Sequence, residues 1–186
     1  MTRGAAIAPS KDGAPAGAAA AEAVTVVDAT ARDTAPGGTL SAEEGASAQA
    51  AALARLRHEL AHPPFHAVLR PEAVSADPDT GTVVIRLPYQ PSFGRAASSG
   101  DVHGGVVAAL IDLAGHAAVA VQIGRMAPTI DLRIDYLRPA PAQDLYATAR
   151  TLKVGRAVAR VDIEVRDADG KLAAAGRGAF SSLKHP

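Results

Sequence analysis

Two polar residues stand alone in an apolar stretch and could do chemistry. Between Val106 and Val121 nearly every residue is Ala, Val, Leu, Ile or Gly, and the exceptions are Asp112 and His116. Burying a carboxylate costs several kcal/mol unless hydrogen bonds or charges compensate it. Asp112 is therefore either a structural carboxylate that caps a loop or another subunit's backbone, or a base or nucleophile in a cleft. The residue pattern leaves both interpretations open.

The sequence His103-Gly104-Gly105 stands just before the same apolar stretch. Glycines at the start of a helix leave its first amide groups open to a ligand's oxygen. This arrangement predicts an oxyanion site, in which backbone N–H groups stabilise a developing negative charge. For His103 itself, a role in packing the loop is the alternative.

Histidine spacing also raises the question of a metal. His116 follows Asp112 by one helical turn and could pair with its carboxylate, although a packed interface histidine is the favoured interpretation. Three further histidines recur at a spacing of four residues: His58, His62 and His66. Because Pro63-Pro64 breaks the helix between the second and third, we expect no metal site. No cofactor is expected either.

The stretch Asp101–Gln122 must position these groups, and it is predicted to be one buried helix. It has no polar face, which excludes an amphipathic surface helix. Twenty residues would make a rod of about 30 Å. Asp112, Gly115 and His116 interrupt it too much for a comfortable membrane span. A fold must therefore wrap around this helix.

Six strands are predicted around that helix. Period-two alternation is clearest in Thr129–Tyr136, where Ile130 and Leu132 share one face. Turn compositions at 77–81 and at Asp169-Gly170 mark two hairpins. The expected strands are His66–Ser75, Gly81–Leu87, Thr129–Tyr136, Leu145–Lys153, Ala157–Arg166 and Lys171–Ser182. One long helix inserted after the second strand favours an α+β architecture with antiparallel pairing.

The N-terminal part divides into two segments. Residues 1–40 are rich in Ala, Gly and Pro without a sustained period, and we expect a disordered tail that is dispensable for folding and activity. Ser41 and Glu44 have the spacing of a capping box, so a helix should begin there and run to about Ala61. Residues 41–62 are thus expected to form an N-terminal amphipathic helix with a leucine stripe.

Composition excludes several classes of function. The 186 residues include 19 basic and 19 acidic side chains, so no general attraction to nucleic acid or membranes is expected. Cysteine is absent, which excludes disulfides and thiolate nucleophiles. The opening residues do not lead from a basic segment into an unbroken apolar core, and we expect a cytoplasmic protein.

Two motifs carry a resemblance to a known family. The string HGGVVAALID, followed by PTIDLRIDYLRPA over 128–140, resembles the hotdog-fold acyl-CoA thioesterases of the phenylacetate-pathway type. The resemblance covers roughly 64–183. It implies a domain over 63–186 in which a curved antiparallel sheet of about six strands wraps a long central helix. It also implies a homodimer or homotetramer with active sites between subunits.

The same resemblance assigns roles to single residues. It implies that the Gly104 amide points at the thioester oxygen, with His103 beside it and Gly105 in the substrate-binding site. Asp112 of the facing subunit would activate water or attack directly, and the Thr129 hydroxyl would help to hold that water. These are catalytic groups of a hydrolase that converts acyl-CoA into a free acid and coenzyme A.

The resemblance also implies a coenzyme-binding residue, and this chain departs from the family pattern at one position. Gly155-Arg156 matches a coenzyme-contacting loop, and the alternative arginines are Arg95, Arg138 and Arg177. Relatives often carry an asparagine six residues before the histidine, where this chain has Ala97; Ser98 or Ser99 could substitute. Ala97 favours a second hypothesis, a non-catalytic hotdog module that binds acyl-CoA or an acyl carrier. A purely structural oligomer would leave Asp112 unexplained, and hydratase chemistry lacks a second acid–base residue. The acyl group is not specified.

Overall fold

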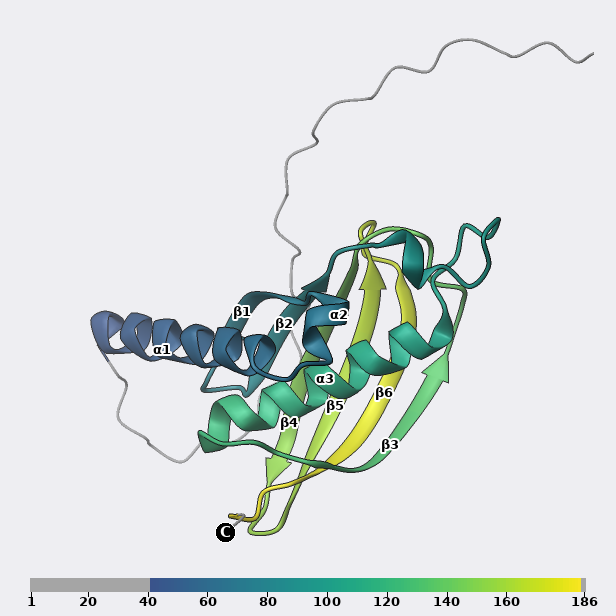
Figure 1. Cartoon of the computed structure of the whole chain (residues 1–186). Coiled ribbons are helices and arrows are strands. Elements are labelled where there is room, and N and C mark those ends of the chain that lie inside the picture. Colours follow the sequence, from purple (N-terminus) through teal and green to yellow (C-terminus); the bar gives the residue numbers. More distant parts are fainter. Residues whose placement is uncertain (1–40, 185–186) are drawn as a thin grey trace, which may run out of the picture. The chain divides into compact units, whose positions relative to one another are not determined.

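A computed structural model describes residues 41–184 of the chain, and the expected tail over 1–40 lies outside the described residues. The elements in chain order are α1 (Ala42–Ala61), α2 (His66–Leu69), β1 (Glu72–Asp77), β2 (Thr82–Leu87), the 3-10 turn Pro91–Phe93, α3 (Gly104–Ile123), β3 (Thr129–Tyr136), β4 (Leu145–Val154), β5 (Val158–Asp167) and β6 (Leu172–Ser181). The predicted α+β class with one long helix after the second strand is confirmed (Figure 1).

Helix α1 begins at the predicted capping box. The Glu44 amide donates to Ser41 Oγ, while the Ser41 amide donates to Glu44 Oε2 at 2.9 Å. These reciprocal bonds satisfy two amides that the helix leaves unpaired. Along its apolar stripe, Ala52, Leu56 and Leu60 are buried in the same core as the sheet and α3. Helix α1 is therefore packed onto the domain that follows it.

The first predicted strand, His66–Ser75, is wrong in its first half. The His66 and Ala67 amides donate to the carbonyls of Pro63 and Pro64, which turns the chain into α2. Arg70 then ends this short helix in the left-handed conformation, with φ of 55°. Only after that does β1 begin, at Glu72. Alternation of apolar residues cannot detect a turn that depends on backbone bonds to two prolines.

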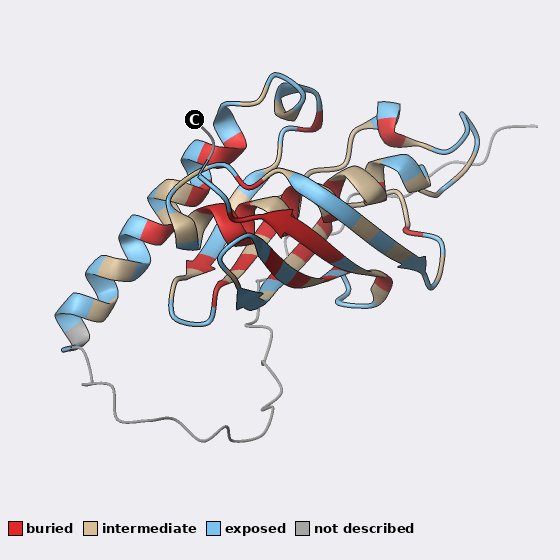
Figure 2. Cartoon of the chain, turned by 90° about the horizontal axis from the view of Figure 1, so that it is seen from below, coloured by how far each residue is buried: buried red, intermediate tan, exposed pale blue. Residues whose placement is uncertain are grey.

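The six strands form one antiparallel sheet in the order β1-β2-β4-β5-β6-β3. The sheet curves around α3, which lies in its concave face and contacts β2, β3, β4, β5 and β6 (Figure 1). Burial follows the same arrangement, since the red buried residues lie where the sheet faces the helix (Figure 2). This is the hotdog fold that the sequence resemblance implies.

Helix α3 packs closely against the sheet because small residues line it. A Cβ at Gly115 would collide with the Phe180 ring of β6, and a Cβ at Gly176 would lie 2.5 Å from Ile111 Cγ2. Side chains at either position would push helix and sheet apart. By length and composition alone α3 could also cross a membrane, but 56% of its apolar window is buried in this fold.

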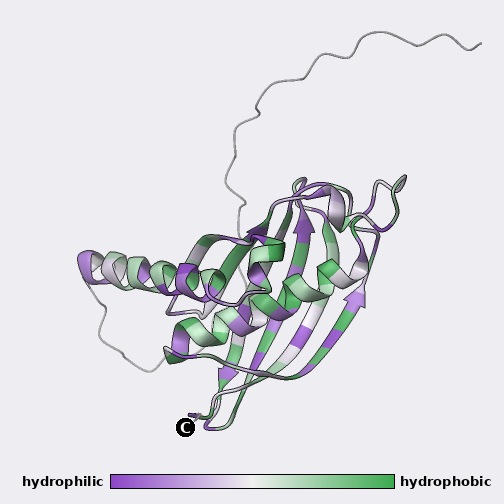
Figure 3. Cartoon of the chain, viewed as in Figure 1, coloured by the Kyte–Doolittle hydropathy of each residue, from purple (hydrophilic) through white to green (hydrophobic). Residues whose placement is uncertain are grey.

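Strand β3 lies at an edge of the sheet. Its only neighbour among the described strands is β6, and both of its faces are largely exposed. Ile130 is 59% exposed and Tyr136 54%, although alternation predicts one buried face. Figure 3 shows apolar and polar residues along this strand. An edge of this kind can pair with another chain.

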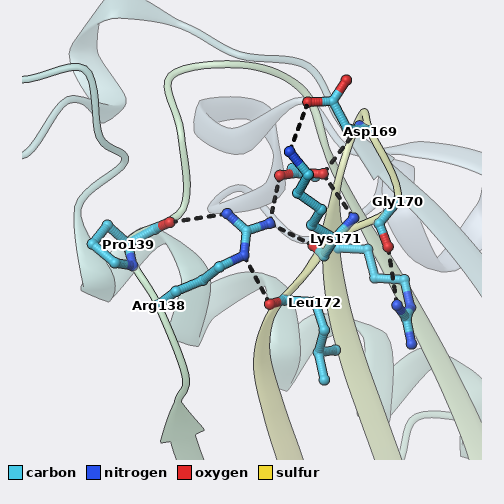
Figure 4. A network of polar contacts seen from close by, with 8 residues as sticks. Arg138, Pro139, Asp169, Gly170, Lys171 and Leu172 are labelled. Carbon is cyan, nitrogen blue, oxygen red and sulfur yellow. Dashed lines mark hydrogen bonds and ion pairs between the residues drawn. The ribbon is translucent and has the colours of Figure 1, made fainter.

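A polar network fastens the end of β3 to the turn between β5 and β6 (Figure 4). Arg138 donates to the Asp167 carboxylate and to the carbonyls of Lys171 and Leu172. Asp167 is 3% exposed and also accepts from the Asp169 and Lys171 amides. Burial acts to raise the pKa of Asp167, but these hydrogen bonds and the Arg138 charge outweigh it and lower the pKa.

Candidate active site

The loop before α3 is fixed at both ends, which places the start of the helix. Phe93 is buried, and its carbonyl accepts from the His103 amide at 2.7 Å. The Val102 amide donates to the Ala140 carbonyl at 2.8 Å, just beyond β3. The loop thus delivers His103 to the first turn of α3 from two directions.

His103 caps α3 with its side chain. The Gly105 amide donates to His103 Nδ1 at 2.9 Å, so Nδ1 is an acceptor and a neutral ring carries its proton on Nε2. Gly105 is expected in the substrate-binding site, and this bond engages its amide within the chain. No hydrogen-bond partner for the Gly104 amide occurs within 41–184. Gly104 is therefore the amide that remains for a ligand.

Tyr136 supports the same helix start, a role that sequence analysis missed. Its hydroxyl donates to the Gly104 carbonyl at 3.0 Å, and its ring lies 3.4 Å from where a Gly104 Cβ would be. Tyr136 is the last residue of β3, so strand and helix meet at this point. Its place on the inner face of an alternating strand was the available signal.

Asp112 lies at a cavity beside the middle of α3. The side chain is partly buried, and its Oδ1 accepts a hydrogen bond of 2.7 Å from the Thr129 hydroxyl. The cavity has a volume of about 290 Å³. Its lining is mainly apolar: Pro63, Phe65, His66, Ala109, Asp112, Leu113, His116, Met126, Pro128 and Thr129. A carboxylate with one oxygen hydrogen-bonded can still use the other as a base.

The structure brings Asp112 and Thr129 together but separates them from the helix start. Gly104 and Asp112 lie eight residues apart on α3. At 1.5 Å per residue the backbone distance is about 12 Å. One thioester carbonyl cannot contact both groups of a single chain.

His116 does not pair with Asp112. Its Nδ1 lies 3.0 Å from the Ala127 carbonyl oxygen and its Nε2 lies 3.3 Å from Glu59 Oε2. Glu59 also forms an ion pair with Arg55. Sequence analysis missed Glu59, although its position next to Leu60 of the apolar stripe was a usable signal.

The chain is similar to several known proteins. Residues 99–174 match the thioesterase superfamily. A predicted esterase of Halobacterium salinarum is 37% identical over 115 residues, which cover 56% of this chain and 76% of the relative. A predicted esterase of Saccharolobus solfataricus is 34% identical over 107 residues, which cover 57% of this chain and 75% of the relative. The chain belongs to the thioesterase superfamily.

Solved structures place this thioesterase superfamily member among the hotdog proteins. A phenylacetic acid degradation-related protein of Ralstonia eutropha is 28% identical, with a TM-score of 0.62 over 69% of this chain and 98% of its own. Zebrafish thioesterase superfamily member 2 is 29% identical, with a TM-score of 0.59 and coverages of 68% and 91%. The PaaI protein of Escherichia coli shows the same fold. It is 24% identical, with a TM-score of 0.63 over 73% of this chain and 99% of its own. Membership places the chain among the thioester hydrolases.

The candidate coenzyme-binding arginines differ in their availability. Arg95 forms an ion pair with Asp101 at 2.9 Å, and Arg177 donates to both oxygens of Asp162. Arg138 belongs to the network with Asp167. Arg156 is exposed in the turn between β4 and β5, and within 41–184 it forms no ion pair. Among the four, it is the cation without an acidic partner in the described part of the chain.

The two serines that follow Ala97, the departure from the family pattern, differ in their contacts. Ala97 is exposed in the loop before α3. Ser99 Oγ accepts from the Ala96 amide and contacts the carbonyls of Ala96 and Asp101, so it stabilises the loop itself. Ser98 is exposed.

In the part of the chain that is described, no three His, Cys, Asp or Glu side chains form a metal-binding group.

Proposed function

We propose that this protein hydrolyses an acyl-CoA thioester to a free acid and coenzyme A. The observation that carries the proposal is the hydrogen bond from Thr129 to Asp112 at the edge of a mainly apolar cavity. It holds one carboxylate oxygen and leaves Oδ2 to accept a proton, beside space for an acyl group. A carboxylate in this position replaces the cysteine nucleophile that the chain lacks.

The oxyanion site is proposed to come from a second subunit. Because about 12 Å of helix separates Gly104 from Asp112, a complete site needs the helix start of one copy and the carboxylate of another. The edge of β3 supports this pairing, since it carries exposed apolar side chains and unpaired backbone groups. Two β3 strands joined edge to edge would continue the sheet across a homodimer, and a homotetramer could assemble from two dimers.

The chemistry then follows from ordinary acyl transfer. Asp112 takes a proton from water, and the hydroxide oxygen bonds to the thioester carbon. The carbonyl oxygen becomes an oxyanion, which the partner's Gly104 amide stabilises. When the carbon–sulfur bond breaks, the electron pair leaves on sulfur and the proton held by Asp112 neutralises the thiolate. Direct attack by Asp112 would instead form a mixed anhydride, which water hydrolyses in a second step.

Arg156 is the proposed contact for the coenzyme. Coenzyme A carries phosphates, and a guanidinium is well suited to bind them with two hydrogen bonds. The position of Arg156 in an exposed turn, without an acidic partner in the described residues, leaves its charge available.

A second candidate function rests on Ala97. Without a polar side chain at that position, the loop offers one hydrogen-bond donor fewer to a thioester, and a hotdog module that binds acyl-CoA or an acyl carrier without turnover would tolerate the loss. The two functions differ in product formation, and both predict binding.

The deciding experiment is thiol release from short, long and aromatic acyl-CoAs by the wild type and by Asp112→Asn. Asparagine keeps an acceptor for Thr129 and cannot take a proton, so the variant should fold, bind and lose activity by about 10²–10⁴-fold. Equal rates in both proteins would remove Asp112 from the mechanism. Binding without turnover by the wild type would support the second candidate.

A further inference from the structure

We propose that His116 is a positioning residue of the Asp112 site, held with both ring nitrogens protonated between Glu59 and the Ala127 carbonyl. The inference rests on the proposed function, because it concerns how Thr129 is kept on Asp112. His116 lines the same cavity as both residues and lies one helical turn beyond Asp112.

The first step concerns Nδ1. It lies 3.0 Å from the Ala127 carbonyl oxygen, which can only accept a hydrogen bond. Nδ1 must therefore carry a proton to make this contact. Ala127 is fully buried, so without the histidine this carbonyl would lose its side-chain partner.

The second step concerns Nε2. It lies 3.3 Å from Glu59 Oε2, and the other oxygen of Glu59 forms an ion pair of 2.6 Å with Arg55. An ionised carboxylate paired in this way with Arg55 can only accept a hydrogen bond. Nε2 must then donate as well. With Glu59 ionised, both contacts together are made by the imidazolium form of His116, which is the form that we propose.

The groups around His116 are consistent with that charge. Glu59 comes from α1 with a side chain 10% exposed, and His116 itself is 18% exposed. His66 of α2 lines the same cavity, and burial followed by repulsion from His116 lowers its pKa. Asp112 faces the cavity from α3. His116 is therefore surrounded by two carboxylates, Arg55 and His66, and the lowered pKa of His66 favours its neutral form.

The consequence for the active site passes through the connection from α3 to β3. His116 holds this connection at Ala127, and β6 holds it one residue later, where the Ser181 amide donates to the Pro128 carbonyl at 2.7 Å. Thr129 follows directly and donates to Asp112. Loss of the Nδ1 contact would release one of the two attachments that aim the hydroxyl.

Two substitutions test the contacts of the two His116 ring nitrogens separately. His116→Asn places an amide N–H near the position of Nδ1 and keeps the donor to Ala127. His116→Gln reaches toward Glu59 instead and leaves the Ala127 carbonyl unpaired. His58→Gln is the control, because His58 is exposed on α1 away from the cavity.

We expect His116→Asn to keep kcat within about threefold of wild type, and His116→Gln to lower kcat about tenfold to a hundredfold with a nearly unchanged KM. His58→Gln should match wild type. Equal kcat values for the Asn and Gln variants would overturn the proposal, since a merely structural histidine would not distinguish them.

A second measurement remains decisive if a variant does not fold or no thioester is hydrolysed. In nitrogen-15 NMR of the wild-type protein, the His116 ring should carry protons on both nitrogens, with its signals assigned by their loss in a His116 variant or by through-bond correlation. A ring protonated on only one nitrogen, at a pH where Glu59 is ionised, would overturn the inference. Absence of turnover would contradict the proposed hydrolase but not the inference about His116, which the NMR measurement would then test by itself.

Discussion

Thr129, the first residue of β3, donates a hydrogen bond of 2.7 Å to Asp112 in the middle of α3. A bulge makes this contact geometrically available. Thr129 pairs with Phe180 and Asp131 with Ala179, so Ile130 is an extra residue on β3. Strict alternation would place Thr129 on the outer face with Asp131 and Arg133, and the bulge turns it inward to the carboxylate.

The hydroxyl of Thr129 should matter less than the carboxylate it holds. Thr129→Val keeps the shape and removes the donor, so kcat should fall about tenfold, which corresponds to one hydrogen bond. Thr129→Ser keeps the donor and should stay within about threefold of wild type. Steady-state kinetics on the best acyl-CoA measure both, and a fully active valine variant would contradict the role of the hydroxyl.

The Gly104 amide can be removed without disturbing the helix. Proline is well tolerated at the first position of a helix, and His103 already has the extended ψ of 134° that a following proline requires. Gly104→Pro should therefore fold and lower kcat by about 10²–10³-fold, the effect of losing one oxyanion donor. Gly104→Ala is the matched control, because it keeps the N–H and its Cβ would lie 3.4 Å from the Tyr136 ring, an ordinary contact.

Mixed oligomers test whether each site is shared. If Gly104 and Asp112 of different subunits form one site, Asp112→Asn and Gly104→Pro chains are inactive alone and complement each other in a mixed dimer. Each mixed dimer holds one intact site out of two, so random reassociation should restore about a quarter of wild-type activity. No recovery after confirmed subunit exchange would contradict a site shared between Gly104 of one subunit and Asp112 of the other.

Two helical glycines should respond to alanine in opposite directions. At Gly115 the new Cβ collides with the Phe180 ring, so Gly115→Ala should lower the free energy of unfolding by about 1–3 kcal/mol. At Gly45 of α1 nothing lies within 4 Å, and Gly45→Ala should raise it by up to about 1 kcal/mol. Urea unfolding of both variants compares them, and a stable Gly115→Ala protein would indicate that α3 can shift from the sheet.

Asp167 makes stability depend on pH at the acidic end. Its pKa is lowered in the folded state, because hydrogen bonds from Arg138 and the Lys171 amide outweigh the effect of burial. A lowered folded pKa contributes stability that is present above the unfolded value of about 3.9 and is lost as pH falls through the folded pKa. At about pH 7, Asp167→Asn should therefore lose about 2 kcal/mol of stability relative to wild type.

The difference in stability between Asp167→Asn and wild type should narrow as pH falls below about 4 toward the lowered folded pKa of Asp167, because the unfolded-state carboxylate becomes protonated first. Asp169→Asn is the control, because the Asp169 side chain is 65% exposed and its Lys171 contact is 4.0 Å long. Urea midpoints across this range give the comparison. If the difference in stability between Asp167→Asn and wild type is the same at all pH values, Asp167 contributes through packing rather than through its charge.

Local sequence signals were sufficient to predict most of the helices and strands and the candidate catalytic residues. The uniformly apolar helix demanded a wrapping sheet, the capping box located the start of α1, and alternation located five of the six strands in nearly full extent. These signals are local: capping depends on residues three apart, and strand alternation on neighbours along one chain. Asp112 was identified as a carboxylate within an apolar stretch, and Gly104 as a glycine at the expected start of a helix.

Which of these residues contact one another depends on the folded chain. The bulge at Ile130, the turn into α2 after Pro63-Pro64 and the pairing of His116 with Glu59 depend on backbone bonds and on side chains 57 residues apart in sequence. Local periodicity contains no information about such contacts. The sequence proposed Asp112 as a base, and the fold decided that Thr129 holds it, because one extra residue in a strand reverses the face on which a side chain lies.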